Sequence, residues 1–172
     1  MMQNLFRLVV ICLLCGIGAC AKSVITFTGA NLPPTIKTIS IANFYNETAE
    51  GPANIAIRFT EELKEYFQRN TKLILVNENG DIQFEGRIIN YQATPLAPQA
   101  GGTQSAALQR LTIGIEVQFT NTKEEKKDFK QVFSFYQDFS ASQTLREVEQ
   151  SLIPIIFEQI IFDIFNKSVA NW

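Results

Sequence analysis

The clearest pattern in this chain is a strict alternation of apolar and polar side chains along residues 111–120. Its apolar members are Leu111, Ile113, Ile115, Val117 and Phe119. A period of two is typical of a β-strand with one buried face, and a shift of register by one residue would expose all five side chains. After a charged stretch at 123–128, phenylalanines recur on one parity at 129, 133, 135 and 139. The two segments therefore predict a long β-hairpin.

Three further strands and one helix are predicted upstream of the hairpin. The segment from Ile36 to Phe44 is rich in β-branched residues, and 73–76 is a short apolar run. Between them, apolar residues recur every four positions from Ile55 to Phe67, which predicts an amphipathic helix of roughly four turns. Strand, helix and strand in this order imply a parallel crossover. Residues 82–91 alternate again, with a change of phase at Ile88-Ile89 that predicts a β-bulge or a strand end.

Between this strand and the hairpin, Thr94–Ser105 is rich in Pro, Gly, Ala and Gln and has no periodicity. The segment is too long for a tight turn and too polar to bury, so we expect a mobile loop.

The last segment predicts a helix that is apolar on nearly every side. Thr144 and Glu147 have the spacing of a capping box, and Pro154 predicts a kink or a division into two helices. From Ile153 to Phe165 there are more apolar side chains than one sheet can cover. Two interpretations stay open: the helix lies deep between the sheet and the loops, or a partner protein covers its outer side. The candidates for a partner-facing surface are Ile156, Phe157, Ile161 and Phe162.

The N-terminus has the layout of a bacterial lipoprotein signal. Arg7 is the only charged side chain among residues 1–19, and an apolar run follows it. Ile17-Gly18-Ala19-Cys20 resembles a lipobox, so we expect cleavage before Cys20 and lipidation of its thiol. Residues 8–19 are too few to span a bilayer, which needs about 20. The predicted organisation is a signal peptide at 1–19, a lipid-anchored segment at 20–35 and one domain at 36–172. Ala21 stands where an aspartate would indicate inner-membrane retention, so we expect the periplasmic side of the outer membrane.

Composition removes most enzyme chemistry. The 172 residues include no histidine, and the only cysteines are Cys12, Cys15 and Cys20, which excludes His-based triads and zinc sites with His ligands. Fifteen basic and seventeen acidic residues give a net charge of -2, which argues against nucleic acid as a partner. Asp81 and Glu85 share a strand parity but lie ~13 Å apart along the backbone, so we expect solvated side chains and no catalytic pair. We predict no enzyme activity, no metal and no cofactor.

Basic side chains gather at the hairpin and are candidates for contacting an anionic ligand such as the phosphates of lipopolysaccharide, or a partner. They are Arg110, Lys123, Lys126, Lys127 and Lys130. Glu124, Glu125 and Asp128 are interleaved with them, which also fits an ordinary solvated hairpin.

Several segments together resemble the lipopolysaccharide-assembly lipoprotein family LptE. They are the lipobox, 27–30, 33–34, 37–41, 71–77, 80–86, 110–113, 119–121 and 163–172, and the resemblance spans nearly the whole mature chain. It implies an α/β domain of the α+β two-layer type, in which two helices pack on one face of a mixed four-stranded sheet. It also implies a non-enzymatic plug that assists assembly of the outer-membrane β-barrel LptD and delivers lipopolysaccharide to the outer leaflet.

A second interpretation keeps the compartment and the fold but changes the partner. Residues 39–46, the following helix and the strand at 81–86 are also similar to outer-membrane lipoproteins that act as adaptors or regulators of secretion pores or cell-wall synthases.

Overall fold

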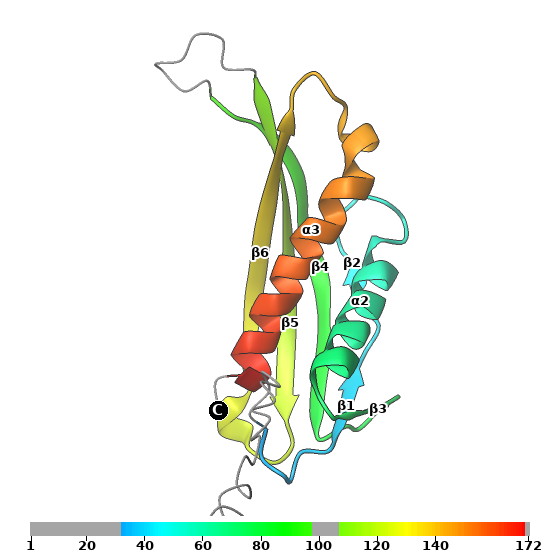
Figure 1. Ribbon diagram of the computed structural model, residues 1–172, viewed down its shortest axis with the longest axis vertical. Coiled ribbons are helices and arrows are strands. Elements are labelled where there is room, and N and C mark those ends of the chain that lie inside the picture. Colours follow the sequence, from blue (N-terminus) through cyan, green and yellow to red (C-terminus); the bar gives the residue numbers. More distant parts are fainter. Residues whose placement is uncertain (1–31, 98–106, 171–172) are drawn as a thin grey trace, which may run out of the picture.

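The computed structural model describes residues 32–97 and 107–170. Its elements are six strands, two long helices and two short helical turns (Figure 1). The strands are β1 (Thr38–Ile41), β2 (Tyr45–Asn46), β3 (Ile74–Val76), β4 (Ile82–Pro95), β5 (Leu108–Asn121) and β6 (Phe129–Ser140). The helices are α2 (Ile55–Asn70) and α3 (Leu145–Phe165), with a 3-10 turn η2 (Glu125–Lys127) and a π turn η3 (Asn166–Ala170).

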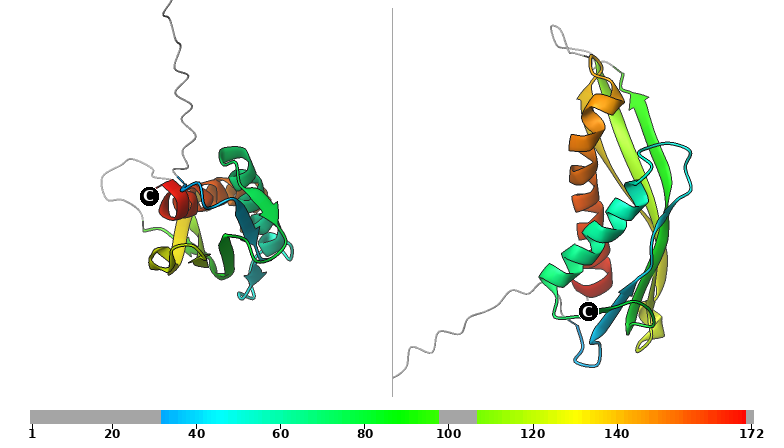
Figure 2. Two further views of the ribbon diagram at one scale, coloured as in Figure 1. Left: turned by 90° about the horizontal axis from the view of Figure 1, so that it is seen from below. Right: turned by 90° about the vertical axis from the view of Figure 1, so that its right-hand side faces the viewer.

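The strands form one mixed sheet in the order β3-β1-β4-β5-β6, with β2 paired to β4. β1 is parallel to β3 and to β4, whereas β4, β5 and β6 form an antiparallel meander. Both helices lie on the same side of the sheet, as the right-hand view of Figure 2 shows. The predicted two-layer α+β fold and the parallel crossover through α2 are confirmed.

The sheet has six strands in the described part of the chain, where the resemblance implied four. One reason is that the segment predicted as a single strand, Ile36–Phe44, does not stay in one line. β1 ends at Ile41, the Ala42 N–H still donates to Phe84 of β4, and a separate strand β2 then pairs with β4 at Tyr45–Asn46, just beyond the predicted segment.

β4 is longer than the alternation indicated. The register shifts between Ile88 and Asn90, which confirms the bulge predicted from the change of phase. Beyond the bulge the ladder continues to Pro95, which lies opposite Gln109. Thr94 and Pro95 are therefore strand residues and not part of the predicted loop, most of which (98–106) lies outside the described residues.

The core lies between the helices and the inner face of the sheet. α2 buries Phe59, Leu63 and Phe67, in agreement with its predicted amphipathic face. The Phe59 ring packs edge-on against Phe44, which follows β1, and against Phe157 of α3, with centroids 5.1 and 5.0 Å apart. Aromatic pairs of this geometry add about 0.5–1.5 kcal/mol beyond the area that they bury.

α3 is one continuous helix that includes Pro154, so of the two predicted outcomes, a kink or a division, the division does not occur. The Glu147 carboxylate accepts the Thr144 N–H at 2.8 Å, as the capping box predicts. Because α2 packs against α3 as well as the sheet, most of the apolar side chains of α3 are covered within the domain, with Tyr66 against Phe165 at 5.3 Å. Neither helix of the described residues is both long enough and apolar enough to cross a bilayer.

Candidate functional site

The sheet face turned away from the helices carries polar side chains that are arranged by regular structure. We call this surface the open face. It carries the alternate residues of three long strands, and these include Glu85 and Arg87 from β4, Glu116 and Gln118 from β5, and Lys130 and Tyr136 from β6. The same alternation that buries the apolar parity places these residues on the opposite face of the sheet, away from the core.

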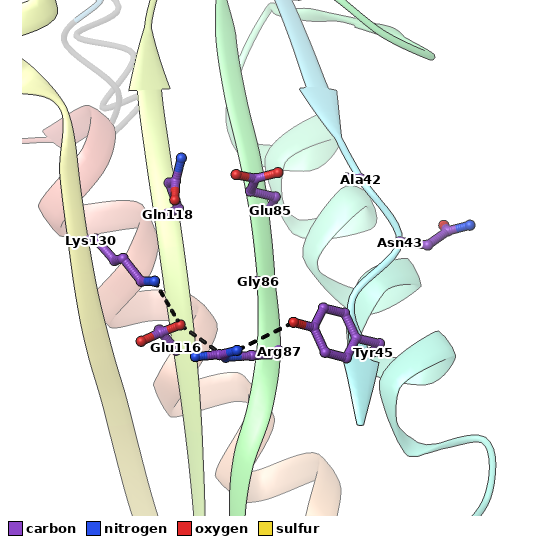
Figure 3. A pocket seen from close by; sticks show the side chains of 9 residues that line it. All are labelled: Ala42, Asn43, Tyr45, Glu85, Gly86, Arg87, Glu116, Gln118 and Lys130. Carbon is purple, nitrogen blue, oxygen red and sulfur yellow. Dashed lines mark hydrogen bonds and ion pairs between the residues drawn. The ribbon is translucent and has the colours of Figure 1, made fainter. Parts of the chain in front are cut away.

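A shallow pocket of ≈ 300 Å³ lies on the open face where β2, β4, β5 and β6 are side by side. Its lining is drawn in Figure 3 and consists of Ala42, Asn43, Tyr45, Glu85, Gly86, Arg87, Glu116, Gln118 and Lys130. Tyr45 stands at one rim with 55% of its surface exposed, which leaves an aromatic group available to a ligand.

Arg87 and Glu116 form the centre of this pocket. The Arg87 Nε lies 3.0 Å from Glu116 Oε1, and the Lys130 Nζ lies 3.2 Å from the same oxygen (Figure 3). The Arg87 Nε also lies 3.2 Å from Glu47 Oε2. An Arg87 Nη donates to the Tyr45 hydroxyl at 3.5 Å. This hydrogen bond and the two carboxylates raise the pKa of Arg87, so its charge is permanent. Cations and carboxylates thus alternate across the strands.

The floor of the pocket depends on a glycine. A Cβ at Gly86 would overlap the Phe44 ring and the backbone oxygen of Glu116. Only glycine lets β4 lie this close to Phe44, which in turn anchors the loop that presents Tyr45.

The groups in the pocket suit binding by hydrogen bonds and charge. Guanidinium, ammonium, carboxylate, amide and phenol groups are present, but the Glu116 carboxylate at the centre already pairs with both Arg87 and Lys130. Within residues 32–97 and 107–170 there is no cluster of three Asp, Glu, His or Cys side chains that could hold a metal ion. The arrangement can hold a polar ligand or a polar protein surface.

The basic residues predicted from sequence do not form one site. Lys130 belongs to the pocket, Lys126 and Lys127 lie exposed on η2, and Lys123 pairs with Asp81 at 2.8 Å. Arg110 lies far from them. Lys130 is opposite Gln118, and the eight residue steps from 110 to 118 correspond to ~26 Å along β5.

Arg110 makes its own compact contact on the open face. It donates to both carboxylate oxygens of Asp138 at 2.7 and 3.0 Å, and its guanidinium lies 3.6 Å from the centre of the Tyr136 ring. The bonds to Arg110 lower the pKa of Asp138.

Asp81 has a structural role that the sequence interpretation missed. One carboxylate oxygen accepts the backbone N–H groups of Lys37 and Thr38 at 2.9 and 3.0 Å, while the other pairs with Lys123. The bond to Lys123 is the largest cause that holds the pKa of Asp81 well below its usual range, followed by the Lys37 N–H. Asp81 thereby joins the starts of β1 and β4 to the β5–β6 turn, whereas Glu85 is exposed as expected. The position of Asp81 immediately after Gly80, at the start of a strand parallel to β1, is the signal that could have indicated this role.

The four predicted partner-facing residues of α3 divide unequally. Ile156, Phe157 and Ile161 are buried in the core, where α3 packs against α2 and the sheet, so they are not available to a partner in this conformation. Phe162 is 46% exposed, and Ile155, which the prediction did not include, is 44% exposed. Seven residues separate them, which places both on one side of α3.

The lipidation site predicted at Cys20 and the segments 1–19 and 20–31 lie outside the described residues.

Comparison with solved structures finds distant proteins, of which the first named here has a similar fold. The hypothetical protein CT253 from Chlamydia trachomatis is 9% identical with a TM-score of 0.53, over 79% of this chain and 99% of that one. A minor lipoprotein from Acinetobacter baumannii is 15% identical with a TM-score of 0.49, over 77% and 92% of the two chains. Rare lipoprotein B from Shewanella oneidensis is 11% identical with a TM-score of 0.43, over 74% and 89%.

Comparison with curated protein sequences finds no significant match. The profile of the family described as LptE, lipopolysaccharide-assembly, matches residues 36–168, which include every strand and both long helices of the described part of the chain. This family is non-enzymatic, in agreement with the prediction of no catalytic activity. The chain therefore belongs to the LptE family of lipopolysaccharide-assembly lipoproteins.

Proposed function

We propose that this protein is anchored through lipidated Cys20 to the periplasmic side of the outer membrane, where it binds the β-barrel LptD, assists its assembly and supports delivery of lipopolysaccharide to the outer leaflet. The observation that carries this proposal is the match of the LptE family over residues 36–168. The lipobox at 17–20 supports the anchor, since two or three acyl chains at ~0.8 kcal/mol per buried methylene hold a protein durably.

Two surfaces are available for the barrel. The exposed side of α3 offers Ile155 and Phe162, separated by the charged Glu158. The open face offers the polar pocket around Arg87. Exposed apolar side chains on one helix side, bordered by charge, are typical of a protein interface.

The partner is tested by affinity purification of the tagged full chain from crosslinked outer membranes. We expect the β-barrel LptD to copurify. The change Phe162→Asp, on an exposed side chain, should reduce this recovery severalfold without unfolding the domain. Ile57→Asp is the matched control, because Ile57 is 66% exposed but lies on α2. Recovery of a secretion pore or a cell-wall synthase in place of the barrel would refute the LptD assignment and favour the adaptor function.

The anchor is tested separately. Cys20→Ala should release the protein from outer-membrane fractions into the periplasm. Persistence of the variant in the outer membrane at wild-type levels would refute anchoring through Cys20.

Contact with lipopolysaccharide is tested at the η2 turn. Lys126→Glu with Lys127→Glu reverses two exposed charges and leaves the Lys123–Asp81 pair in place. We expect weaker binding of lipopolysaccharide, measured by fluorescence titration, and a smaller effect of Arg110→Gln at the distant end of the hairpin. Unchanged binding in the double variant would remove η2 from the contact surface.

A further inference from the structure

β6 forms an edge of the sheet. It pairs with β5 on one side, and no other strand of residues 32–97 and 107–170 pairs with its second side. Figure 1 shows β6 as a long border strand beside α3. Val132 and Tyr136, on its open-face parity, are 47% and 44% exposed. A strand of twelve residues with one unpaired edge presents a row of N–H and C=O groups that a further strand can satisfy.

The sequence of β6 is chemically symmetric about Ser134. Moving outward in both directions, Phe133 matches Phe135, Val132 matches Tyr136, and Gln131 matches Gln137. Next, Lys130 matches Asp138, and Phe129 matches Phe139. Each pair therefore joins apolar to apolar, amide to amide, or positive to negative.

We propose that β6 is a homodimer interface, at which the same strand of a second copy pairs antiparallel with Ser134 opposite Ser134. In this register each residue faces its symmetric counterpart, and cross-strand apolar and opposite-charge pairs each stabilise a sheet by about 0.2–1 kcal/mol. A two-residue slip would place Lys130 opposite Ser140 and Val132 opposite Asp138, so the charges would lose their partners. A one-residue slip would bring opposite faces of the two strands together.

The charges that flank β6 favour a second copy over an unrelated strand. Within one chain, Lys130 pairs with Glu116 at 3.2 Å and Asp138 pairs with Arg110 at 2.7 Å. In the proposed register Lys130 also faces Asp138 of the second copy. The order across the junction is then Glu116, Lys130, Asp138 and Arg110, in which negative and positive charges alternate. The two-fold axis repeats this row on the other side of Ser134, as expected for an isologous interface. This inference does not depend on the proposed function.

A cysteine at the symmetry point tests the register. Residues directly opposite in an antiparallel pair have Cα atoms about 4.5–5.5 Å apart, within the range that a disulfide spans. We expect the detergent-solubilised full chain with Ser134→Cys to form a disulfide-linked dimer on mild oxidation, seen on non-reducing gels. Ser140→Cys is the matched control, since its two copies would lie ~40 Å apart. The parent chain, with only its natural cysteines, reports any cross-link that those residues make.

A second pair of positions distinguishes this register from random collision. Val132→Cys combined with Tyr136→Cys should cross-link, because residue 132 faces residue 136 of the other copy, whereas each single change should not. Lys130→Asp should raise the dimer dissociation constant about tenfold in sedimentation velocity, because it places like charges opposite each other at both ends. The proposal is overturned if Ser134→Cys stays monomeric while circular dichroism shows a folded chain, or if Ser140→Cys cross-links equally well.

Discussion

Removal of the Asp81 carboxylate is the sharpest test of how this fold is held together. Two backbone N–H groups donate to one oxygen of this side chain, and Lys123 pairs with the other. Only 17% of the Asp81 side chain is exposed, so water replaces these bonds incompletely. Hydrogen bonds to charged groups contribute about 1.5–3 kcal/mol each. The Lys37 N–H is near solvent, so in the variant a hydrogen bond to water replaces part of its contribution. We therefore expect Asp81→Ala to lower the free energy of unfolding by about 2–3 kcal/mol.

Two further variants separate the contributions. Asp81→Asn keeps an oxygen that can accept both backbone N–H groups and loses only the charge and the bond to Lys123, so it should cost ~1 kcal/mol. Lys123→Met removes the same pair from the other side, where the lysine side chain is 47% exposed, and should cost less than ~1 kcal/mol. For a chain of this size, the Asp81→Ala loss corresponds to a melting temperature lower by about 5–10 °C.

Urea unfolding followed by circular dichroism measures all three values. An Asp81→Ala chain within about 0.5 kcal/mol of the parent would refute the structural role of this carboxylate. An Asp81→Asn chain as unstable as Asp81→Ala would show that charge, and not the backbone hydrogen bonds, carries the effect.

Further predictions concern packing and pH. Gly86→Ala should cost about 1–3 kcal/mol or more, because the added methyl overlaps the Phe44 ring; an unchanged melting temperature would contradict this. Phe157→Ala, at a fully buried ring, should cost about 3–5 kcal/mol. Phe162→Ala, at an exposed ring of the same helix, should cost less than ~1 kcal/mol, and equal losses in these two variants would refute the burial assigned to α3. The pKa values of Asp81, Asp138 and Glu147 are lowered in the folded state, so their stabilisation is complete at neutral pH. This stabilisation should be lost as pH falls through and below about 4. The free energy of unfolding should therefore decrease less steeply with falling pH when Asp81 is Asn. Burial and Glu149 raise the pKa of Tyr91, so its contribution is complete below about pH 10 and should be lost only as the pH rises through the higher value of the folded state, which ultraviolet titration of tyrosine can follow.

The sequence was sufficient for most of the regular elements, because each of them buries one face. The alternation at 111–119 and the four-residue spacing at 55–67 were both confirmed, as was the bulge after Ile88. Strand number was harder to predict, because β2 has only two residues and exists through its pairing with β4. The residues around Tyr45 and Asn46 do not indicate by themselves that they pair with β4.

Side-chain roles were predicted less well than elements, since they depend on contacts between distant segments. Asp81 looked like a solvated residue because its partners, Lys37, Thr38 and Lys123, are at least 42 positions away. The apolar surplus of α3 left burial within the domain and a partner interface both open, because the sequence does not show that α2 packs beside it; the structure favours burial for most of these side chains. The basic residues of the hairpin do not form one site, because a hairpin brings its strands together but keeps its two ends apart.

The burial of α3 has a consequence for the order of events in the cell. The core of this protein is completed by its own sheet and by α2, so folding does not wait for a partner to supply missing surface. Under the proposed function, the chain would reach its final conformation first and bind its partner afterwards. A shortage of that partner would then leave a folded protein and not a misfolded one.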